Sequence, residues 1–400
     1  MASFQDSPDE VILKVVTYLD INDLVKFGEV SKRMKAISND ITLWKKMNLS
    51  RNEWSWCDEF DVPTNFVEMV IENGCQYLSL QNVKVGTPRG TSREPISMKS
   101  EEHFLLEKAS SLRYLDLKYC GAHVLISEEI LSSCHLLQKL SMASNIITSK
   151  IIRSICYQNG RTLQSLDLSF CSGLNIESIQ KITQNCVGLK NVDLSATGLS
   201  NDSINFLVQN LTPKVENLGL GHLLNLKDDH VKALVARCNK LSVLDLKHTK
   251  ITNISLTHII VNLQHTLKKL DVHIWNGITY PKVTELKSME KLRVLNFDPM
   301  RFYLGYLEKE NLTKLMPLVR FGESICVVER ELLPADGIWD VEAKQIEYFK
   351  KFAKFQFEKL PIKAMLRIAN FLERKDLVKV GQVSKKMKCI IQNRMIQNCR

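Results

Sequence analysis

Cysteine and histidine are the residues of this 400-residue chain that could bind a metal or act as nucleophiles, and it contains 11 cysteines and nine histidines. Zinc sites need such residues at short fixed spacings, for example Cys-x-x-Cys. The sequence has no Cys-x-x-Cys pair and no His/Cys cluster at ligand spacing, so we expect neither a metal nor a cofactor. It also begins without a signal peptide, which argues against a disulfide framework. Free thiols are typical of cytoplasmic and nuclear proteins, and the sequence predicts one of these locations.

Catalysis and nucleic-acid binding are both disfavoured. An enzyme needs a convergent set of titratable groups, a metal site or a phosphate-binding loop, and the sequence shows none of these, so we nominate no catalytic residue. The net charge of +10 could suit a nucleic acid, but lysine and arginine are dispersed along the chain. The densest basic clusters are residues 32–35 and 385–388. We therefore expect protein partners, with no nucleic acid and no membrane.

A Leu-x-x-Leu-x-Leu unit recurs along the middle of the chain. Successive units begin 37, 25, 26, 26, 26, 26, 26 and 25 residues apart. A fixed period of this length predicts one strand per unit, followed by a helix on the outside of a curved stack. Two such helices are expected over residues 201–208 and 228–235. The units begin at Leu112, Leu137, Leu163, Leu189, Val215, Leu241, Leu267 and Leu292, after a degenerate first unit at Cys75.

The repeat also accounts for several cysteines. Cys120 and Cys171 occupy the ninth position of their units, and Cys134, Cys186 and Cys238 each lie three residues before the first leucine of a unit. Such repeated positions predict buried core thiols. The pattern resembles the cysteine-containing leucine-rich-repeat family, whose repeats often follow an F-box. The resemblance implies an α/β leucine-rich-repeat solenoid, a horseshoe with parallel strands inside and helices outside.

A column of carboxylates is predicted on the inner face of this stack. The residue between the last two leucines of a unit points opposite to them, because side chains alternate along a strand. Five of these residues are aspartates, about 5 Å apart from strand to strand. They predict a negative strip in a groove that takes a peptide with basic and apolar anchors. The alternative is that these aspartates help to satisfy neighbouring strand groups. The residues expected to contact a substrate are Tyr119, Asp167, Phe170, Asp193, His222, Asp245, His248 and His273.

The N-terminal residues predict a module of three short helices. Ser7 can cap a helix with Pro8 at its first position, and Glu10 can complete a capping box. Apolar residues recur at helical spacing on both sides of a polar break at residues 20–23. Helices this short need a partner or a neighbouring domain to cover their apolar face. In their order along the chain, Pro8, Tyr18-Leu19, Asp23-Leu24, Val30-Ser31-Lys32-Arg33 and Leu43-Trp44 resemble the F-box family.

The two resemblances together imply a non-catalytic function. They imply a substrate-recognition subunit of a Skp–cullin–F-box ubiquitin ligase, which binds a Skp-type adaptor, and through it a cullin–RING ligase, and directs a protein bound on the repeats to proteasomal degradation. The alternative is a repeat scaffold for protein interactions that has no ligase function. The residues that the resemblance implies for the adaptor are Pro8, Val11, Ile12, Leu19, Leu24, Val30, Met34 and Trp44.

A second F-box-like segment is predicted at the other end of the chain. Residues 8–37 align without a gap with the residues 353 positions later. The counterparts of Leu43-Trp44 are Ile396-Gln397, so this copy lacks the tryptophan and is incomplete. It could recruit a second adaptor. The alternatives are a degenerate duplication and a gene model that runs into a tandem paralogue.

The remaining segments complete the predicted domain order. Val85–Pro95 has the composition of a loop, and residues 315–321 and 324–328 predict one or two final strands. The Ile338-Trp339-x-Val341 sequence resembles the tail of the S-phase-kinase-associated F-box receptor. The predicted boundaries are 1–49 for the F-box, 50–74 for linker helices, 75–300 for about nine repeats, 301–355 for a capping tail and 356–400 for the second F-box-like segment.

Overall fold

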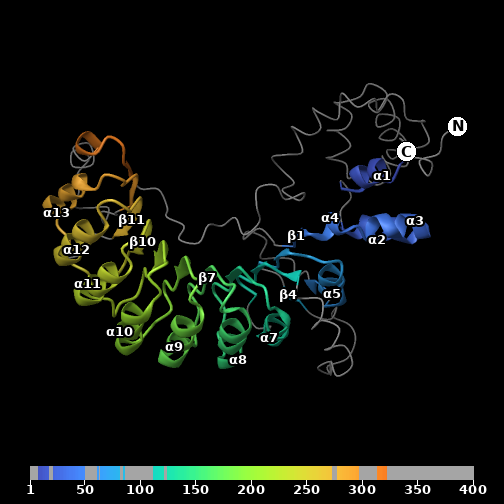
Figure 1. Cartoon of the computed structure of the whole chain (residues 1–400), viewed down its shortest axis with the longest axis horizontal. Coiled ribbons are helices and arrows are strands. Elements are labelled where there is room, and N and C mark those ends of the chain that lie inside the picture. Colours follow the sequence, from blue (N-terminus) through green and yellow to red (C-terminus); the bar gives the residue numbers. More distant parts are fainter. Residues whose placement is uncertain are drawn as a thin grey trace, which may run out of the picture. The chain divides into compact units, whose positions relative to one another are not determined.

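The computed structural model of this chain (Figure 1) contains two compact units among its described residues. One unit extends to Lys46 and the other begins at Met47. Each unit is described by itself below. The described residues are 8–17, 21–49, 61–62, 64–81, 84–85, 111–120, 124–272, 277–296 and 313–321.

The first unit is helical. Its helix α1 begins at Asp9 because Pro8 has an extended ψ of 147°, and the Pro8 carbonyl oxygen accepts hydrogen bonds from the backbone N–H groups of Val11 and Ile12. Pro8 therefore precedes the helix and is not its first residue, which corrects the sequence prediction. The predicted cap, Ser7, lies outside the described residues. The helices are α1 (Asp9–Val16), α2 (Ile21–Glu29), α3 (Lys32–Ser38) and α4 (Ile41–Trp44).

Side-chain caps define the later helices of this unit. The Ser31 hydroxyl accepts a hydrogen bond from the Met34 N–H at the start of α3, and an Asp40 carboxylate oxygen accepts one from the Thr42 N–H at the start of α4. Such caps satisfy backbone donors that the first turn of a helix leaves without a partner. The one-turn helix α4 is additional to the three helices that the sequence predicts, and α2 begins inside the predicted polar break.

The apolar stripes of these helices pack against one another. A Cβ atom on Gly28 would lie 2.5 Å from the Ser38 hydroxyl oxygen, so glycine allows α2 to approach α3 closely. The Trp44 indole N–H donates a hydrogen bond of 2.6 Å to the Ser38 carbonyl oxygen. The buried side chains, none more than 6% exposed, are Ile12, Val16, Leu24, Met34, Ile37, Leu43 and Trp44.

The second unit is built on an 11-stranded sheet whose strands follow chain order. Its neighbouring strands from β3 to β13 pair in parallel, and the leucines of successive units stand in register, as Leu115 does with Leu140. Each of the nine predicted units supplies one strand. One further strand lies at each end. The strands are β1 (Lys46–Asn48), β3 (Tyr77–Ser79), β5 (Tyr114–Asp116), β6 (Lys139–Ser141), β7 (Ser165–Asp167), β8 (Asn191–Asp193), β9 (Asn217–Gly219), β10 (Val243–Leu246), β11 (Lys269–Val272), β12 (Val294–Asn296) and β13 (Arg320–Phe321).

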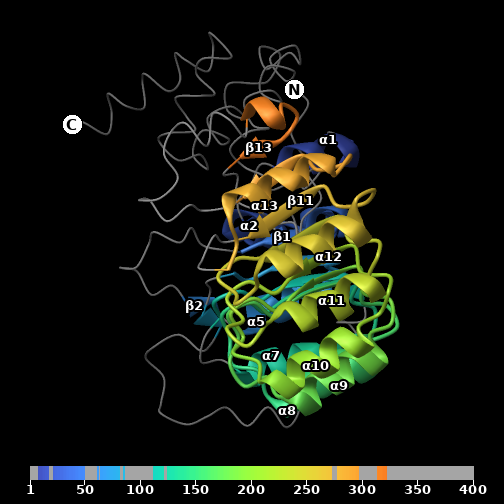
Figure 2. The ribbon, with the colours of Figure 1, turned by 90° about the vertical axis from the view of Figure 1, so that its left-hand side faces the viewer.

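A helix follows most of these strands, and the helices stack on one side of the sheet (Figures 1 and 2). The hydroxyl groups of Thr148 and Ser200 and the side-chain oxygen of Asn175 accept hydrogen bonds from first-turn N–H groups. Both helices predicted from the sequence are confirmed, within α10 and α11. The helices are α7 (Val124–Ser133), α8 (Ser149–Arg153), α9 (Ile176–Asn185), α10 (Asn201–Asn210), α11 (Asp228–Arg237), α12 (Asn253–Leu263) and α13 (Tyr280–Thr284), with a π-helical turn at Ser154–Gln158 after α8.

The core of this unit lies between sheet and helices and contains leucines and cysteines. Every described cysteine is a buried thiol outside any disulfide, which confirms the predicted burial of the repeat cysteines. At the ninth position of the unit the thiol also donates a hydrogen bond. Cys120 Sγ lies 3.2 Å from the Leu80 carbonyl oxygen, and Cys171 Sγ lies 3.0 Å from the Met142 carbonyl oxygen. Thr197 and Thr249 donate hydrogen bonds to carbonyls from the same position. In these four repeats the position therefore holds a small donor that bonds a carbonyl oxygen in or beside the turn after the strand, whereas the unit that begins at Val215 has Leu223 there.

The segments around the repeats differ in part from the predictions. Val85 pairs with Val62 in a small parallel ladder of β2 (Asp61–Val62) and β4 (Lys84–Val85), so it is not a loop residue. Helix α5 (Thr64–Glu72) lies in the predicted linker. Of the final strand predicted within residues 315–321, only Arg320–Phe321 is a strand, β13, whereas Leu315 is helical. The remaining predicted segments lie outside the described residues, namely 86–95, 324–328, the tail with Ile338-Trp339-x-Val341 and the second F-box-like copy.

Candidate functional site

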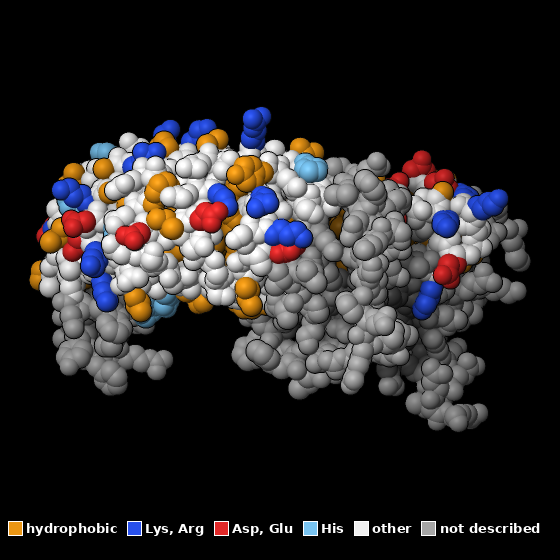
Figure 3. Space-filling view, turned by 90° about the horizontal axis from the view of Figure 1, so that it is seen from below, with side chains coloured by type: hydrophobic (Ala, Val, Ile, Leu, Met, Phe, Trp, Pro, Cys, Tyr) orange, Lys and Arg blue, Asp and Glu red, His pale blue; other side chains and the backbone are white. Residues whose placement is uncertain are grey.

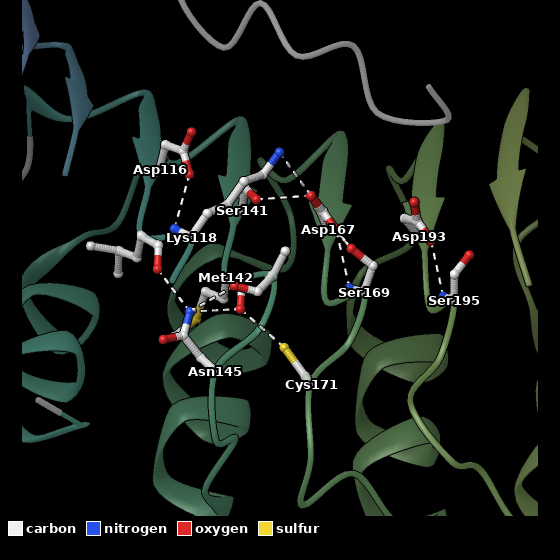
Figure 4. Close-up of polar contacts among 12 residues, drawn as sticks. Asp116, Lys118, Ser141, Met142, Asn145, Asp167, Ser169, Cys171, Asp193 and Ser195 are labelled. Atoms are coloured by element: carbon white, nitrogen blue, oxygen red, sulfur yellow. Dashed lines mark hydrogen bonds and ion pairs between the residues drawn. The ribbon is translucent and has the colours of Figure 1, made fainter. Parts of the chain in front are cut away.

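The aspartate column is part of the fold and not an open acidic strip. Asp116, Asp167, Asp245 and Asp271 are buried, and Asp193 is half-buried. In four of the five, a carboxylate oxygen accepts a hydrogen bond of 2.9–3.0 Å from the backbone N–H two residues later. Figure 4 shows three of these contacts. Each of these four carboxylates thus satisfies a donor just after its strand, as the structural alternative predicts.

Two lysines neutralise part of this column. Lys118 Nζ lies 3.2 Å from Asp167, and Lys247 Nζ lies 3.1 Å from Asp245. Asp193 has no ion-pair partner among the described residues. Burial raises the pKa of Asp193 to about 6, and the negative charges of Asp167 and Asp245 contribute to the rise. The charge of Asp193 is therefore not compensated by a lysine or arginine at ion-pair distance among the described residues.

A second column follows the strands, one residue before the cysteine position. All six of its described members have a left-handed backbone with φ between 53° and 60°. Their N–H groups bond the next repeat, as Phe170 N–H does with the Ser195 carbonyl oxygen. We call this set the αL row, and it comprises Tyr119, Ser144, Phe170, Ala196, His222 and His248.

The αL row brings together four of the predicted substrate contacts. Tyr119 is 48% exposed and Phe170 is 58% exposed. The His222 ring centroid lies 6.3 Å from that of Phe170 and 4.3 Å from that of His248. Burial, and then the neighbouring His248 and Lys247, lower the pKa of His222, which favours an uncharged ring. The fifth predicted contact beyond the aspartates, His273, lies outside the described residues.

The sequence analysis missed two apolar residues at this edge. Ile146 is 55% exposed and Leu224 is 64% exposed, and each lies at the tenth position of its unit, two residues beyond the αL row. An alignment of the repeats could have found them, because both are aliphatic residues four positions beyond the last leucine position of the unit, in the turn that follows the strand. The left-handed backbone of the row has no comparable signal, since most of its members are not glycine or asparagine.

The predicted adaptor residues fall into two groups. Pro8, Val11 and Val30 are exposed, with Val30 at 65%. The others that are described, Ile12, Leu24, Met34 and Trp44, are buried in the helical unit and can only support such a surface. Leu19 lies outside the described residues. Sequence reasoning missed Ile41, which is 53% exposed at the start of α4.

An ion pair holds the first and third helices of this unit together. The Arg33 guanidinium Nε and Nη2 lie 2.9 Å and 2.6 Å from one Asp9 carboxylate oxygen. Both side chains are largely exposed, so the pair contributes little stability. It does fix the orientation of α1 relative to α3, and with it the positions of Val11 and Pro8.

The helical face of the repeats shows no concentration of one chemical type among the described residues. Figure 3 shows lysine and arginine interspersed with acidic and apolar side chains on this face. The described residues contain no group of three His, Cys, Asp or Glu side chains that could hold a metal ion. No helix among them is long and apolar enough to span a membrane.

Comparison with solved structures gives a match to the "Crystal structure of Rad7 and Elc1 complex in yeast". The sequence identity is 12%, and the match covers 65% of this chain and 83% of that chain with a TM-score of 0.33. The family assignment rests instead on comparisons with family models.

Three family models match the chain. The "F-box-like" model matches residues 8–50, and the "F-box domain" model matches residues 357–397. The latter match confirms the predicted likeness of the C-terminal segment to an F-box. The model described as "SKP2 LRR domain" matches residues 76–316, which is more than half of the chain. This protein therefore belongs to the F-box and leucine-rich-repeat family, with repeats of the SKP2 type.

Proposed function

We propose that this protein is the substrate-recognition subunit of a Skp–cullin–F-box ubiquitin ligase. The observation that carries the proposal is the presence, in one chain, of an F-box match at residues 8–50 and SKP2-type repeats at 76–316. The F-box binds a Skp-type adaptor, and the repeats hold the protein to be ubiquitinated. The chain contributes no catalytic group and acts by bringing the substrate close to a ubiquitin-charged enzyme.

The adaptor-binding surface consists of the exposed apolar residues of the helical unit. Val11, Val30 and Ile41 are between 37% and 65% exposed, although apolar side chains of this size gain free energy by leaving water. Exposed apolar groups on a small helical module indicate an interaction surface. The buried Ile12, Met34 and Trp44 keep the helices that carry these residues in place.

Co-purification of the full chain with a Skp-type adaptor tests this proposal. We expect the wild type to bind, and Val30→Glu to weaken binding at least about tenfold, because a charge would be buried in an apolar interface. Val261→Glu is the matched control, since Val261 is a comparably exposed valine (71%) on α12 of the repeats. Thermal unfolding of both variants verifies that they fold.

Two outcomes would refute the ligase proposal. One is a wild-type chain that does not bind any Skp-type adaptor. The other is a Val30→Glu variant, together with Ile41→Glu, that binds as tightly as the Val261→Glu control. Either result would leave the repeat scaffold without ligase function as the better description.

A further inference from the structure

The side chains of the αL row are larger than the repeat requires. A left-handed backbone is strained for an L-residue, and bulky residues adopt it rarely. Ser144 and Ala196 show that a small residue fits this position. Tyr119 and Phe170 nevertheless occupy it with rings that are about half exposed. Backbone strain and exposed aromatic surface at one site both indicate a function other than folding.

These residues and the exposed aliphatic residues two positions further on lie in the turns that follow successive strands. The rings of Phe170, His222 and His248 follow one another at 6.3 Å and 4.3 Å. The surface spans six neighbouring repeats, five of which contribute a side chain, and at about 4.8 Å per strand it extends over roughly 24 Å, the length of about seven extended residues. We call it the edge patch, and it comprises Tyr119, Ile146, Phe170, His222, Leu224 and His248.

The charge beside the middle of the edge patch is negative. The inward positions of β7, β8 and β9, and the position two residues after each strand, hold carboxylates and small or amide side chains but no lysine or arginine. Lys118 and Lys247 flank this region and pair with Asp167 and Asp245, so the carboxylates of the column outnumber the lysines beside them. Asp167 is already paired with Lys118, whereas Asp193 has no ion-pair partner among the described residues. Gly219 and Gly221 lie beside the carboxylates of Asp193 and Asp245. A Cβ atom at either glycine would lie within 3.0 Å of a carboxylate oxygen, so the absence of a side chain leaves both carboxylates uncovered on that side.

We propose that the edge patch docks an extended segment of the substrate protein in which a lysine or arginine stands beside aromatic or aliphatic side chains. The cation faces Asp193, and the apolar side chains pack on Phe170, His222 and Leu224. Cations also bind well over aromatic rings, and the same sheet contains an example, since Lys139 Nζ lies 4.9 Å from the Tyr114 ring centroid. This docking site depends on the proposed ligase function in one respect, which is that the docked protein is taken to be the substrate of the ligase.

Selection from a displayed library of random peptides against the full chain, bound to its adaptor, tests the chemistry of the segment. The expected result is an enriched pattern with lysine or arginine next to aromatic or aliphatic residues. An acidic pattern, a purely apolar pattern or no enrichment would each overturn the proposal.

Variants of the patch then test its position with a synthetic peptide of the enriched sequence. Phe170→Ser should weaken binding about tenfold or more, and it is expected to fold because Ser144 occupies the same backbone position. Asp193→Asn should weaken binding about fivefold and reduce its salt dependence. Val261→Ala on α12 is the matched control and should leave binding unchanged.

The two proposals fail separately in this design. Unchanged peptide affinity in Phe170→Ser or in Asp193→Asn would overturn the docking site, whatever the adaptor does. Adaptor binding is measured on the same preparations and should be unaffected by the patch variants, because they lie outside the F-box. A chain that binds the peptide but no adaptor would overturn the ligase proposal and support the edge patch.

Discussion

The ammonium group of Lys118, which follows β5, lies 3.2 Å from a carboxylate oxygen of Asp167 at the end of β7. The pair extends across β6, whose Ser141 hydroxyl donates a hydrogen bond of 2.9 Å to the same oxygen (Figure 4). Both charged side chains are largely buried, with 15% and 5% exposed. This contact links three successive repeats and shows that the fold itself uses the Asp167 carboxylate.

Asp167→Asn should destabilise the repeats. It removes the negative member of a buried ion pair, and breaking a buried pair by removing one member costs about 3 kcal/mol. Denaturant unfolding of the full chain, followed by a probe of the repeat unit, measures the change. An unfolding free energy equal to that of the wild type would contradict the structural role assigned to Asp167.

Asp193→Asn should have the opposite effect at neutral pH. The pKa of Asp193 is raised by burial and by its acidic neighbours to about 6 in the folded protein, against about 3.9 for an unperturbed aspartate. The folded state therefore binds the proton more tightly than the unfolded state, and above pH 6 the ionised carboxylate lowers stability. An amide avoids this penalty, so the variant should be more stable by about 1–2 kcal/mol at pH 7.5.

The pH dependence of the stability difference between Asp193→Asn and the wild type tests this assignment. As pH falls through 6 towards 4, the wild-type carboxyl takes up its proton in the folded state, and the advantage of Asp193→Asn should disappear. Unfolding free energies at pH 7.5 and pH 5 measure this difference. A stability difference that does not depend on pH would contradict the assignment.

Ala196→Gly should stabilise the repeats by about 0.5–1 kcal/mol. Ala196 has a φ of 57°, which strains an alanine but not a glycine, and part of the gain is offset by the greater freedom of glycine in the unfolded chain. The N–H that bonds the Gly221 carbonyl oxygen is retained. The matched control is Ala233→Gly inside α11, which should destabilise by a similar amount. Thermal unfolding should show a higher melting temperature than the wild type for Ala196→Gly and a lower one for Ala233→Gly.

Native thiols of the core should resist alkylation. Burial raises the pKa of Cys134 and of Cys171 to about 12, so that few thiolates form at pH 8 and reagents have no access. Peptide mapping by mass spectrometry after iodoacetamide treatment should find both residues unmodified in the native protein and modified after denaturation. Modification of Cys171 under native conditions would show that the turn after β7 opens.

One adaptor per chain is the expected stoichiometry. In the first F-box, the buried Trp44 indole fills the helical core and donates to Ser38, whereas its counterpart in the second copy is Gln397. A glutamine lacks the ring that provides this burial. Native mass spectrometry of the complex should give a 1:1 ratio that Val30→Glu abolishes. A 2:1 ratio would show that the second F-box match binds independently.

The sequence alone determined the repeat architecture, because its evidence is local and periodic. Leucines at a nearly constant interval, with Cys120 and Cys171 at one fixed position, require one strand per unit, and the structure confirms each strand. The order of F-box residues from Pro8 to Trp44 was also readable, since short helices depend on local apolar spacing.

Only the tertiary structure decided which of the predicted residues face a partner. Alternation along a strand placed Asp167 and Asp245 on the inner face, but their burial depends on neighbouring repeats, and the lysine partner of Asp167 is Lys118, two repeats earlier in the sequence. Likewise, the exposure of Val30 and the burial of Trp44 follow from how the helices of the first unit pack against one another. The left-handed turns that align Phe170 with His222 arise from hydrogen bonds between repeats, so no local pattern could reveal them.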